Sequence, residues 1–269
     1  MSATTEPRRG RGLADCATIL YRNTLALKRE PAILAANLAA PLGLVLMFGY
    51  VFGGALGAAS SADAYRDALI PAVFVLVAGT AMVNVAGATA MDASNGVTTR
   101  FRTLPMARFA VPAGAAGSQL LLSLMSLGAM SLVGLAIGWR VDTGAASAVA
   151  GFALVLLFGF ALSWVGIYLG LVICNAELVQ QLAPLIFAVV MLSNAFVPTS
   201  TMPRALGAVA DWNPASAAIA ALRELFGNRA AAPDGPLPMD HPVLATIIWS
   251  IVLLAIFAPA SARRYGRAD

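Results

Sequence analysis

Six apolar runs separated by polar connections set the pattern of this chain. Each approaches or exceeds the roughly 20 residues that an α-helix needs to cross a bilayer core about 30 Å thick. The runs are continuous, whereas the strands of a transmembrane barrel show short alternating patterns. The pattern therefore predicts an all-α integral membrane protein. Its six transmembrane helices, within a domain over 32–262, are expected at 33–56, 69–91, 110–138, 148–174, 178–197 and 243–260.

A helical pattern of another kind precedes the first span. In residues 13–31 apolar side chains recur every three or four positions, while Arg22, Lys28 and Arg29 fall elsewhere on the helix. This pattern favours an amphipathic interfacial helix in the headgroup layer. A helix packed on a soluble partner is the alternative. Residues 1–12 are basic and contain Pro and Gly, which predicts a disordered tail.

The longest connection, 198–242, lies between the fifth and sixth spans and is not hydrophilic. It shows two short amphipathic patterns that are broken at Asn213-Pro214. One interpretation is a re-entrant external segment, which requires that other protein cover its backbone. The other is a surface loop with two interfacial helices.

The distribution of charge gives the chain an orientation. Only 11% of its residues are charged, against about 25% in soluble domains. Of the seventeen Lys and Arg, twelve lie before the first span, in the 92–109 loop or in the tail at 263–269. The positive-inside bias therefore predicts that both termini are cytoplasmic. The net charge of +4 then reflects orientation, with no nucleic-acid partner.

The source membrane is also suggested by composition. Arg occurs sixteen times against one Lys, in an alanine-rich chain, which indicates a GC-rich bacterial genome. We therefore expect a multi-pass protein of the bacterial inner or plasma membrane.

Ionisable groups are missing from the six predicted span cores, because all thirteen acids and all seventeen basic residues lie outside them. Ion-coupled carriers usually hold such groups inside the membrane. Hydrolases and metalloenzymes need nucleophile–base pairs or His, Cys and acid clusters. The single lysine, Lys28, follows no glycine-rich phosphate loop. We therefore expect no catalytic, metal or cofactor site here, and ATP with Mg²⁺ only on a partner subunit.

The polar residues inside the predicted spans are uncharged amides and hydroxyls. Such side chains usually hydrogen-bond a neighbouring helix. Together with nearby apolar residues they would alternatively line a mostly apolar path for an amphipathic or lipid-like substrate. The candidate path residues are Phe74, Met82, Asn84, Phe187, Met191 and Asn194.

Two stretches together resemble the daunorubicin-resistance-like permeases, the type-2 ABC exporter family. The inner loop of that family is matched, in NGVTTRFRTLPMAR at 95–108, by Gly96, Arg100, Phe101, Arg102, Leu104, Pro105 and Met106. The family's segment after the fifth span is matched in 192–228 by Asn194, Phe196, Val197, Pro198, Met202, Pro203, Asn213, Pro214 and Arg223. Thr99 departs from the family, in which an acid is common there, and Ala115 stands where an Arg often follows Gly114.

The resemblance implies a half-transporter for export. Two permeases, either two copies or two relatives, would pair in the lipid membrane, and each would rest on one ATP-binding-cassette subunit. The implied ATPase-coupling residues are Asp92, Gly96, Arg100, Phe101, Arg102, Leu104, Pro105, Arg108 and Glu177. The implied external gate comprises Pro198, Pro203, Asn213, Pro214 and Arg223. The cargo would be an amphipathic drug, antibiotic or lipid.

Three other functions remain open at this stage. A polysaccharide or glycolipid exporter would tend to line its path with aromatic residues, and this chain is only 8% aromatic. An ATP-independent channel or carrier is disfavoured by the absence of charge within the spans. A membrane anchor for a cytosolic enzyme would leave the apolar external connection unexplained.

Overall fold

A computed structural model describes residues 39, 42–43, 45–47, 62–98, 109–194, 202–227 and 237–266. From residue 62 onward its regular structure is helical throughout these ranges, as the sequence predicts. The helices are α4 (Ala62–Ser94), α6 (Ala110–Ala136), α7 (Ala145–Ile173), α8 (Ala176–Gln180), α9 (Ala183–Met191), α10 (Arg204–Asp211), α11 (Pro214–Phe226), α12 (Leu237–Asp240) and α13 (Pro242–Gly266). Four of them, α4, α6, α7 and α13, are long and apolar enough to cross a membrane.

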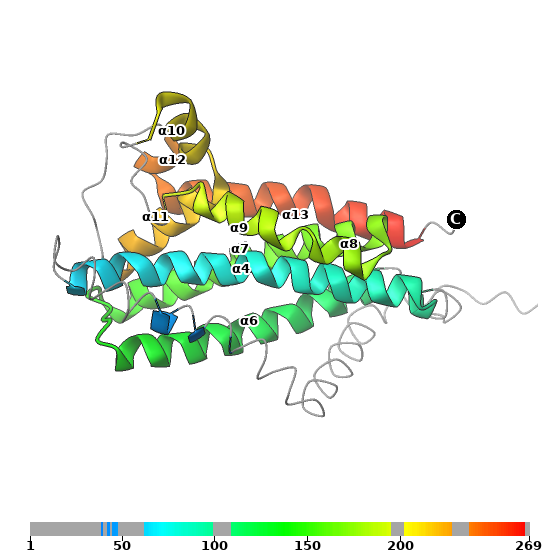
Figure 1. The fold of residues 1–269 in the computed structure, drawn as a ribbon, viewed down its shortest axis with the longest axis horizontal. Helices are drawn as coiled ribbons and strands as arrows, with labels where there is room; N and C mark the ends of the chain where they lie inside the picture. The colour runs from blue at the N-terminus through cyan, green and yellow to red at the C-terminus, as the bar shows by residue number, and fades with distance from the viewer. Residues whose placement is uncertain are drawn as a thin grey trace, which may run out of the picture.

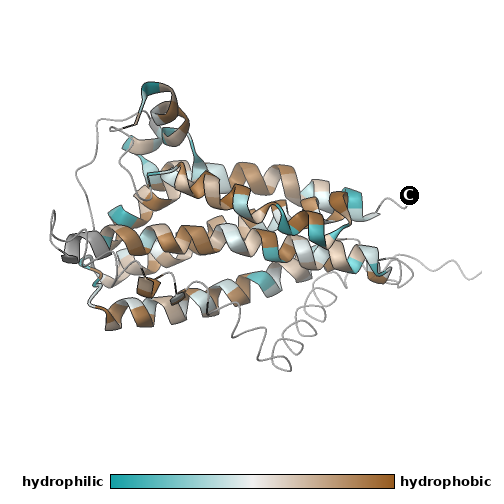
Figure 2. Ribbon diagram, in the orientation of Figure 1, coloured by the Kyte–Doolittle hydropathy of each residue, from teal (hydrophilic) through white to brown (hydrophobic). Residues whose placement is uncertain are grey.

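These four long helices form a bundle (Figure 1). α4, α7 and α13 run in one direction and α6 runs in the other. α7 is the central element, because it packs on α4, α6, α11 and α13. Hydrophobic residues predominate along the long helices, and hydrophilic ones gather toward the bundle ends (Figure 2). In a bilayer this pattern satisfies the backbone within each helix and leaves apolar side chains for the lipid.

Four predicted spans are confirmed as helices, namely the second, third, fourth and sixth. The second begins earlier than expected, since α4 starts at Ala62, and the sixth ends later, at Gly266. Of the first span only a few residues are described, and one of them, Val45, is fully buried in the main core. The predicted helix at 13–31 lies outside the described residues. The total of six spans therefore remains a prediction.

The fifth predicted span differs from the expected single helix. Residues 176–191 form two short helices, α8 and α9, separated at Gln181 and Leu182. Pro184 lies in the first turn of α9 and has no N–H for a bond to the preceding turn. The backbone tightens at the break, where Leu182 N donates to Val179 O. The span prediction used the length of the apolar run, and it did not use the position of Pro184 within that run.

The contact between α4 and α7 depends on glycines of α7. A Cβ on Gly166 would lie 2.3 Å from the Met82 carbonyl oxygen, and one on Gly170 would lie 2.4 Å from the Ala86 carbonyl oxygen. No side chain fits at such distances. The G-x-x-x-G spacing at 166–170 is the known sequence signal for this close approach of two membrane helices. It is a signal that the span-level prediction did not use.

The main core lies at the bundle end where α4 begins and α6 ends. Phe74, Trp139 and Phe226 meet edge to face there, with ring centroids 5.4–6.2 Å apart. All three are almost fully buried. Gly151 of α7 makes room for the Phe226 ring, which a Cβ at that position would meet at 2.6 Å. This aromatic cluster fixes α11 against α4, α7 and the connection that follows α6.

Candidate functional site

Four chain segments meet at one end of the bundle, where α4 and α7 end, α6 begins and α13 ends (Figure 1). We call this the loop end, defined by residues 92–98, 109–112, 174–177 and 263–266. Of the predicted coupling residues, Asp92 and Glu177 are exposed at this end, and Gly96, with φ +70°, lies in the turn that follows α4. The others lie outside the described residues: Arg100, Phe101, Arg102, Leu104, Pro105 and Arg108.

A tight turn follows α7 at this end. Cys174 ends α7 in the left-handed region, with φ 50° and ψ 22°. Asn175 then caps α8, because its Oδ1 accepts hydrogen bonds from Glu177 N at 2.9 Å and Leu178 N at 3.1 Å. The cap places the Glu177 carboxylate in the first turn of α8, where the helix dipole favours a negative charge.

Replacing Cys174 by Gly is expected to stabilise the turn by about 1 kcal/mol, because Gly adopts positive φ without a Cβ penalty. The gain is reduced by the loss of the weak bond from Cys174 Sγ to Leu171 O, at 3.3 Å. The measurement is the midpoint of heat unfolding in detergent. Cys174→Val, which is β-branched, should lower that midpoint. A higher midpoint for Val than for Gly would contradict this account.

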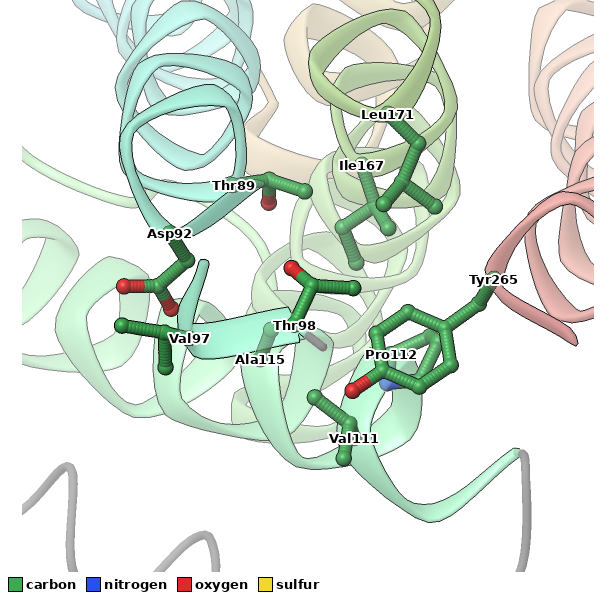
Figure 3. A pocket seen from close by; sticks show the side chains of 10 residues that line it. All are labelled: Thr89, Asp92, Val97, Thr98, Val111, Pro112, Ala115, Ile167, Leu171 and Tyr265. Carbon is green, nitrogen blue, oxygen red and sulfur yellow. The ribbon is translucent and has the colours of Figure 1, made fainter. Parts of the chain in front are cut away.

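A cavity of about 40 Å³ lies just inside the loop end (Figure 3). Its walls come from α4, the turn after it, and α6, α7 and α13. Thr89, Asp92, Thr98 and Tyr265 bring oxygen atoms to an otherwise apolar lining. The remaining lining residues are Val97, Val111, Pro112, Ala115, Ile167 and Leu171. The first turns of α6 therefore border a void rather than a fully packed interface.

The connection between the fifth and sixth predicted spans contains three described helices, α10, α11 and α12, and the first two are separated at the predicted Asn213-Pro214. Asn213 caps α11 through a bond from Ala215 N to its Oδ1 at 2.9 Å. Its Nδ2 donates to Val189 O of α9 at 2.8 Å. Pro214 occupies the first helical turn, where its missing N–H costs nothing. Asn213 thus separates α10 from α11, caps α11 and bonds it to α9.

α10 and α11 differ in their surroundings. Leu206 and Val209 of α10 are exposed, and so is Trp212 at its C-cap. In α11, by contrast, Ala217, Ile219 and most neighbouring residues are fully buried. α11 also packs on α4, α7 and α13. Of the two interpretations of this connection, a purely surface position is therefore wrong for α11, since three long helices cover its backbone.

Arg223 joins α11 to two other elements. Its Nε and Nη2 donate to Ala68 O at 3.0 and 2.8 Å, and its Nη1 donates to Asn194 O at 3.0 Å. Burial lowers the pKa of Arg223 to about 10, so the guanidinium stays charged near neutral pH. α11 lies outside the four helices that are long enough to span. The guanidinium of Arg223 therefore links α11 to the N-terminal part of α4 and to the residues that follow α9.

The other predicted gate residues are more scattered. Pro203 is exposed at the start of α10, and Pro214 is half-buried beside Asn213. Pro198 lies outside the described residues. Beyond Arg223, the last carbonyls of α11 are bound by the α6–α7 connection: Thr143 Oγ1 donates to Leu225 O, and Asp142 N donates to Phe226 O. The sequence did not indicate this second attachment.

The predicted path residues fall into two groups. Phe74 is fully buried in the aromatic cluster and Met82 is 6% exposed in the α4–α7 contact. The interpretation of these two as path residues is not supported, because packing against other helices leaves them almost no accessible surface. Asn84 and Phe187 are exposed, and Met191 and Asn194 are half-buried. These four remain candidates.

Comparison with known proteins decides the family. A profile described as ABC-2 type transporter matches residues 14–226, which is most of the chain. The chain belongs to the ABC-2 type transporter family. It is also 33% identical over 266 residues to the daunorubicin resistance ABC transporter permease protein DrrB1 of Streptomyces coeruleorubidus. That alignment covers 98% of this chain and 90% of the relative. The resemblance seen in the two sequence stretches is thereby confirmed, and the chain is a type-2 ABC permease.

Proposed function

We propose that this permease is the membrane half of an ATP-driven exporter for an amphipathic drug, antibiotic or lipid. The observation that carries the proposal is its near full-length similarity to a permease named for daunorubicin resistance. The apolar spans support it, because no Asp, Glu, Lys or Arg occurs at 68–91, 110–136, 145–173 or 242–262. Without ionisable groups in the membrane, an ion gradient has no visible relay in these helices. Energy then comes from a separate ATP-binding-cassette subunit that holds ATP and Mg²⁺.

The loop end is the proposed docking face for that subunit. It brings together the exposed Asp92 and Glu177, and the 99–108 segment, which follows α4 and precedes α6 in the sequence, contains Arg100, Arg102 and Arg108. Arg263 and Arg264 lie in the last turn of α13 at this end. The excess of positive charge supports a cytoplasmic position, with both termini inside and the chain in a bacterial plasma membrane.

The proposed path follows one side of α4. Between residues 69 and 87 every residue of α4 is buried except Thr80 and Asn84, one helical turn apart. α8 and α9 lie beside this face, since a Cβ on Gly79 would meet Ile186 and one on Gly87 would meet Gln180, each at 3.0 Å. Uncharged polar groups on a membrane-facing surface favour contact with protein or cargo over lipid. A second permease facing this side would enclose the path.

α11 is the proposed external gate. It lies at the bundle end opposite the loop end, joined to α9 through Asn213 and to α4 through Arg223. A change in the position of α4 or α9 would therefore act directly on α11. In the proposed cycle ATP favours one of two arrangements, to the extent that the paired ATPases bind ATP more tightly in it.

The docking proposal predicts the outcome of a charge reversal in the 99–108 segment. Arg100→Glu with Arg102→Glu should lower the recovery of the ATPase about tenfold or more, since 1.4 kcal/mol of lost binding is a factor of 10. The measurement is a tagged purification from the native membrane in mild detergent, with mass spectrometry of the associated proteins. It also shows whether a second, different permease is present.

The matched control reverses two charges at the opposite end, Arg140→Glu with Arg204→Glu. Both residues are exposed, and the change in net charge is the same. This control should bind the ATPase as the unmodified chain does. Equal recovery of the ATPase with the loop variant and the control would contradict docking at the loop. Recovery of the unmodified chain with no ATPase, even after crosslinking, would instead favour a channel or carrier.

A further inference from the structure

The start of α6 has an unusual first residue. Phe109 occupies the N-cap position, and no side chain caps the helix there. Ser, Thr, Asp and Asn are strongly preferred at N-caps, because their oxygen accepts a bond from the first backbone N–H groups. The Phe109 ring instead stacks on Trp164 of α7, with centroids 5.1 Å apart and planes 21° apart. A residue that breaks a local preference usually serves a tertiary contact or a function.

Trp164 is the centre of the second core, at the loop end. It is 2% exposed and packs with residues of α4, α6 and α13. Its own carbonyl accepts a hydrogen bond from Ser261 Oγ of α13 at 3.3 Å. Phe160, one turn earlier, meets its ring edge to face at 6.3 Å. A displacement of Trp164 would therefore also displace α7, on which it lies, and α13, which it contacts.

The surroundings of Phe109 differ from those of Trp164. Phe109 is 47% exposed, at the N-cap of α6. The next residues of α6, Val111, Pro112 and Ala115, border the cavity at the loop end (Figure 3). The first turns of α6 thus have room on one side and an aromatic contact on the other. Because aromatic stacking is directional, the Phe109–Trp164 contact fixes the orientation of the start of α6. The cavity supplies no such contact on the other side.

We infer that Phe109 is a positioning residue, whose stack on Trp164 transmits the position of the α6 start to α7 and α13. This inference rests on the proposed function, in which an ATPase contacts the segment just before α6. Movement of that segment displaces the Phe109 ring, and the ring carries Trp164 with it. The cavity separates Val111, Pro112 and Ala115 of α6 from Thr89 and Asp92 of α4. Nucleotide binding on the partner thereby reaches α7 and α13, two of the three long helices that cover α11.

The test uses Trp164 as its own reporter in the complex with the co-purified ATPase. Emission is recorded without nucleotide and after trapping with ATP, Mg²⁺ and vanadate. Subtracting the same spectra of Trp164→Phe, which keeps a ring but removes the indole, isolates the Trp164 signal from that of every other tryptophan. We expect trapping to change this signal in the unmodified chain. Phe109→Ala should abolish the change while the ATPase still co-purifies in the same ratio.

Two further variants separate stacking from simple burial. Phe109→Tyr keeps the ring and should retain the nucleotide-dependent change. Phe109→Leu keeps apolar bulk without a ring and should lose most of it. A change that persists in Phe109→Ala overturns the inference, and so does an unmodified complex whose Trp164 signal ignores trapping. Neither result affects the proposed function, which fails separately if the unmodified chain binds no ATPase.

Discussion

Gly166→Leu is expected to prevent the recovery of folded permease. A Cβ at this position would lie 2.3 Å from the Met82 carbonyl oxygen and 2.7 Å from a Val85 methyl group. The obstacle at Met82 is backbone, so no side-chain rotation relieves it, and α4 and α7 must separate along their main contact. We expect a cost of more than about 3 kcal/mol, beyond that of ordinary overpacking. The measurement is the monodisperse peak in size-exclusion chromatography, with the midpoint of heat unfolding.

The matched control is Gly128→Leu in α6, where a Cβ meets nothing within 4 Å. Leu has a higher helix propensity than Gly, so this change should be neutral or stabilising by up to about 1 kcal/mol. Gly159→Ala is a second control, because its new Cβ would lie at an ordinary 3.5 Å from Ala78. If Gly166→Leu eluted and melted like Gly128→Leu, the close approach of α7 to α4 would be wrong.

Arg223→Leu is expected to release α11 from its neighbours and to abolish transport. The change removes three charge-assisted hydrogen bonds and leaves the carbonyl oxygens of Ala68 and Asn194 without this donor. Hydrogen bonds to charged groups contribute about 1.5–3 kcal/mol each, and they are not additive within one side chain. We expect a loss of about 2–4 kcal/mol, seen as a lower midpoint of heat unfolding. Arg223→Lys should be intermediate, because one ammonium cannot reproduce the guanidinium fork.

A local readout distinguishes release of α11 from general instability. Ala217 on α11 is fully buried, so a cysteine placed there should react slowly with maleimide in a chain with Cys16 and Cys174 replaced by serine. Adding Arg223→Leu should speed that reaction at a temperature where the protein stays folded. Arg204→Leu removes an exposed cation from the same connection and serves as the control. Equal labelling rates for the two variants would show that Arg223 does not hold α11.

The loop end and the opposite end of the bundle were predictable to different degrees. The turn at Cys174 to Glu177 was predictable, because an Asn following an apolar run is a local cap signal. The break at Asn213-Pro214 was predictable for the same reason. The stack of Phe109 on Trp164 was not, since a phenylalanine at a helix start carries no signal for its partner. Its one detectable sign was the absence of a capping residue before α6.

The sequence alone determined the span pattern, the charge-free membrane helices, the turn residues and the family resemblance. These are local properties: the length of an apolar run, a cap, a proline, or a motif read along the chain. Only the tertiary structure decided that Phe74 is core and that α11 is buried. The bond from Arg223 to Ala68 joins residues 155 positions apart. Such a pair depends on how several helices pack together. Apolar periodicity indicates which face of a helix is buried, but it does not indicate which other helix that face contacts.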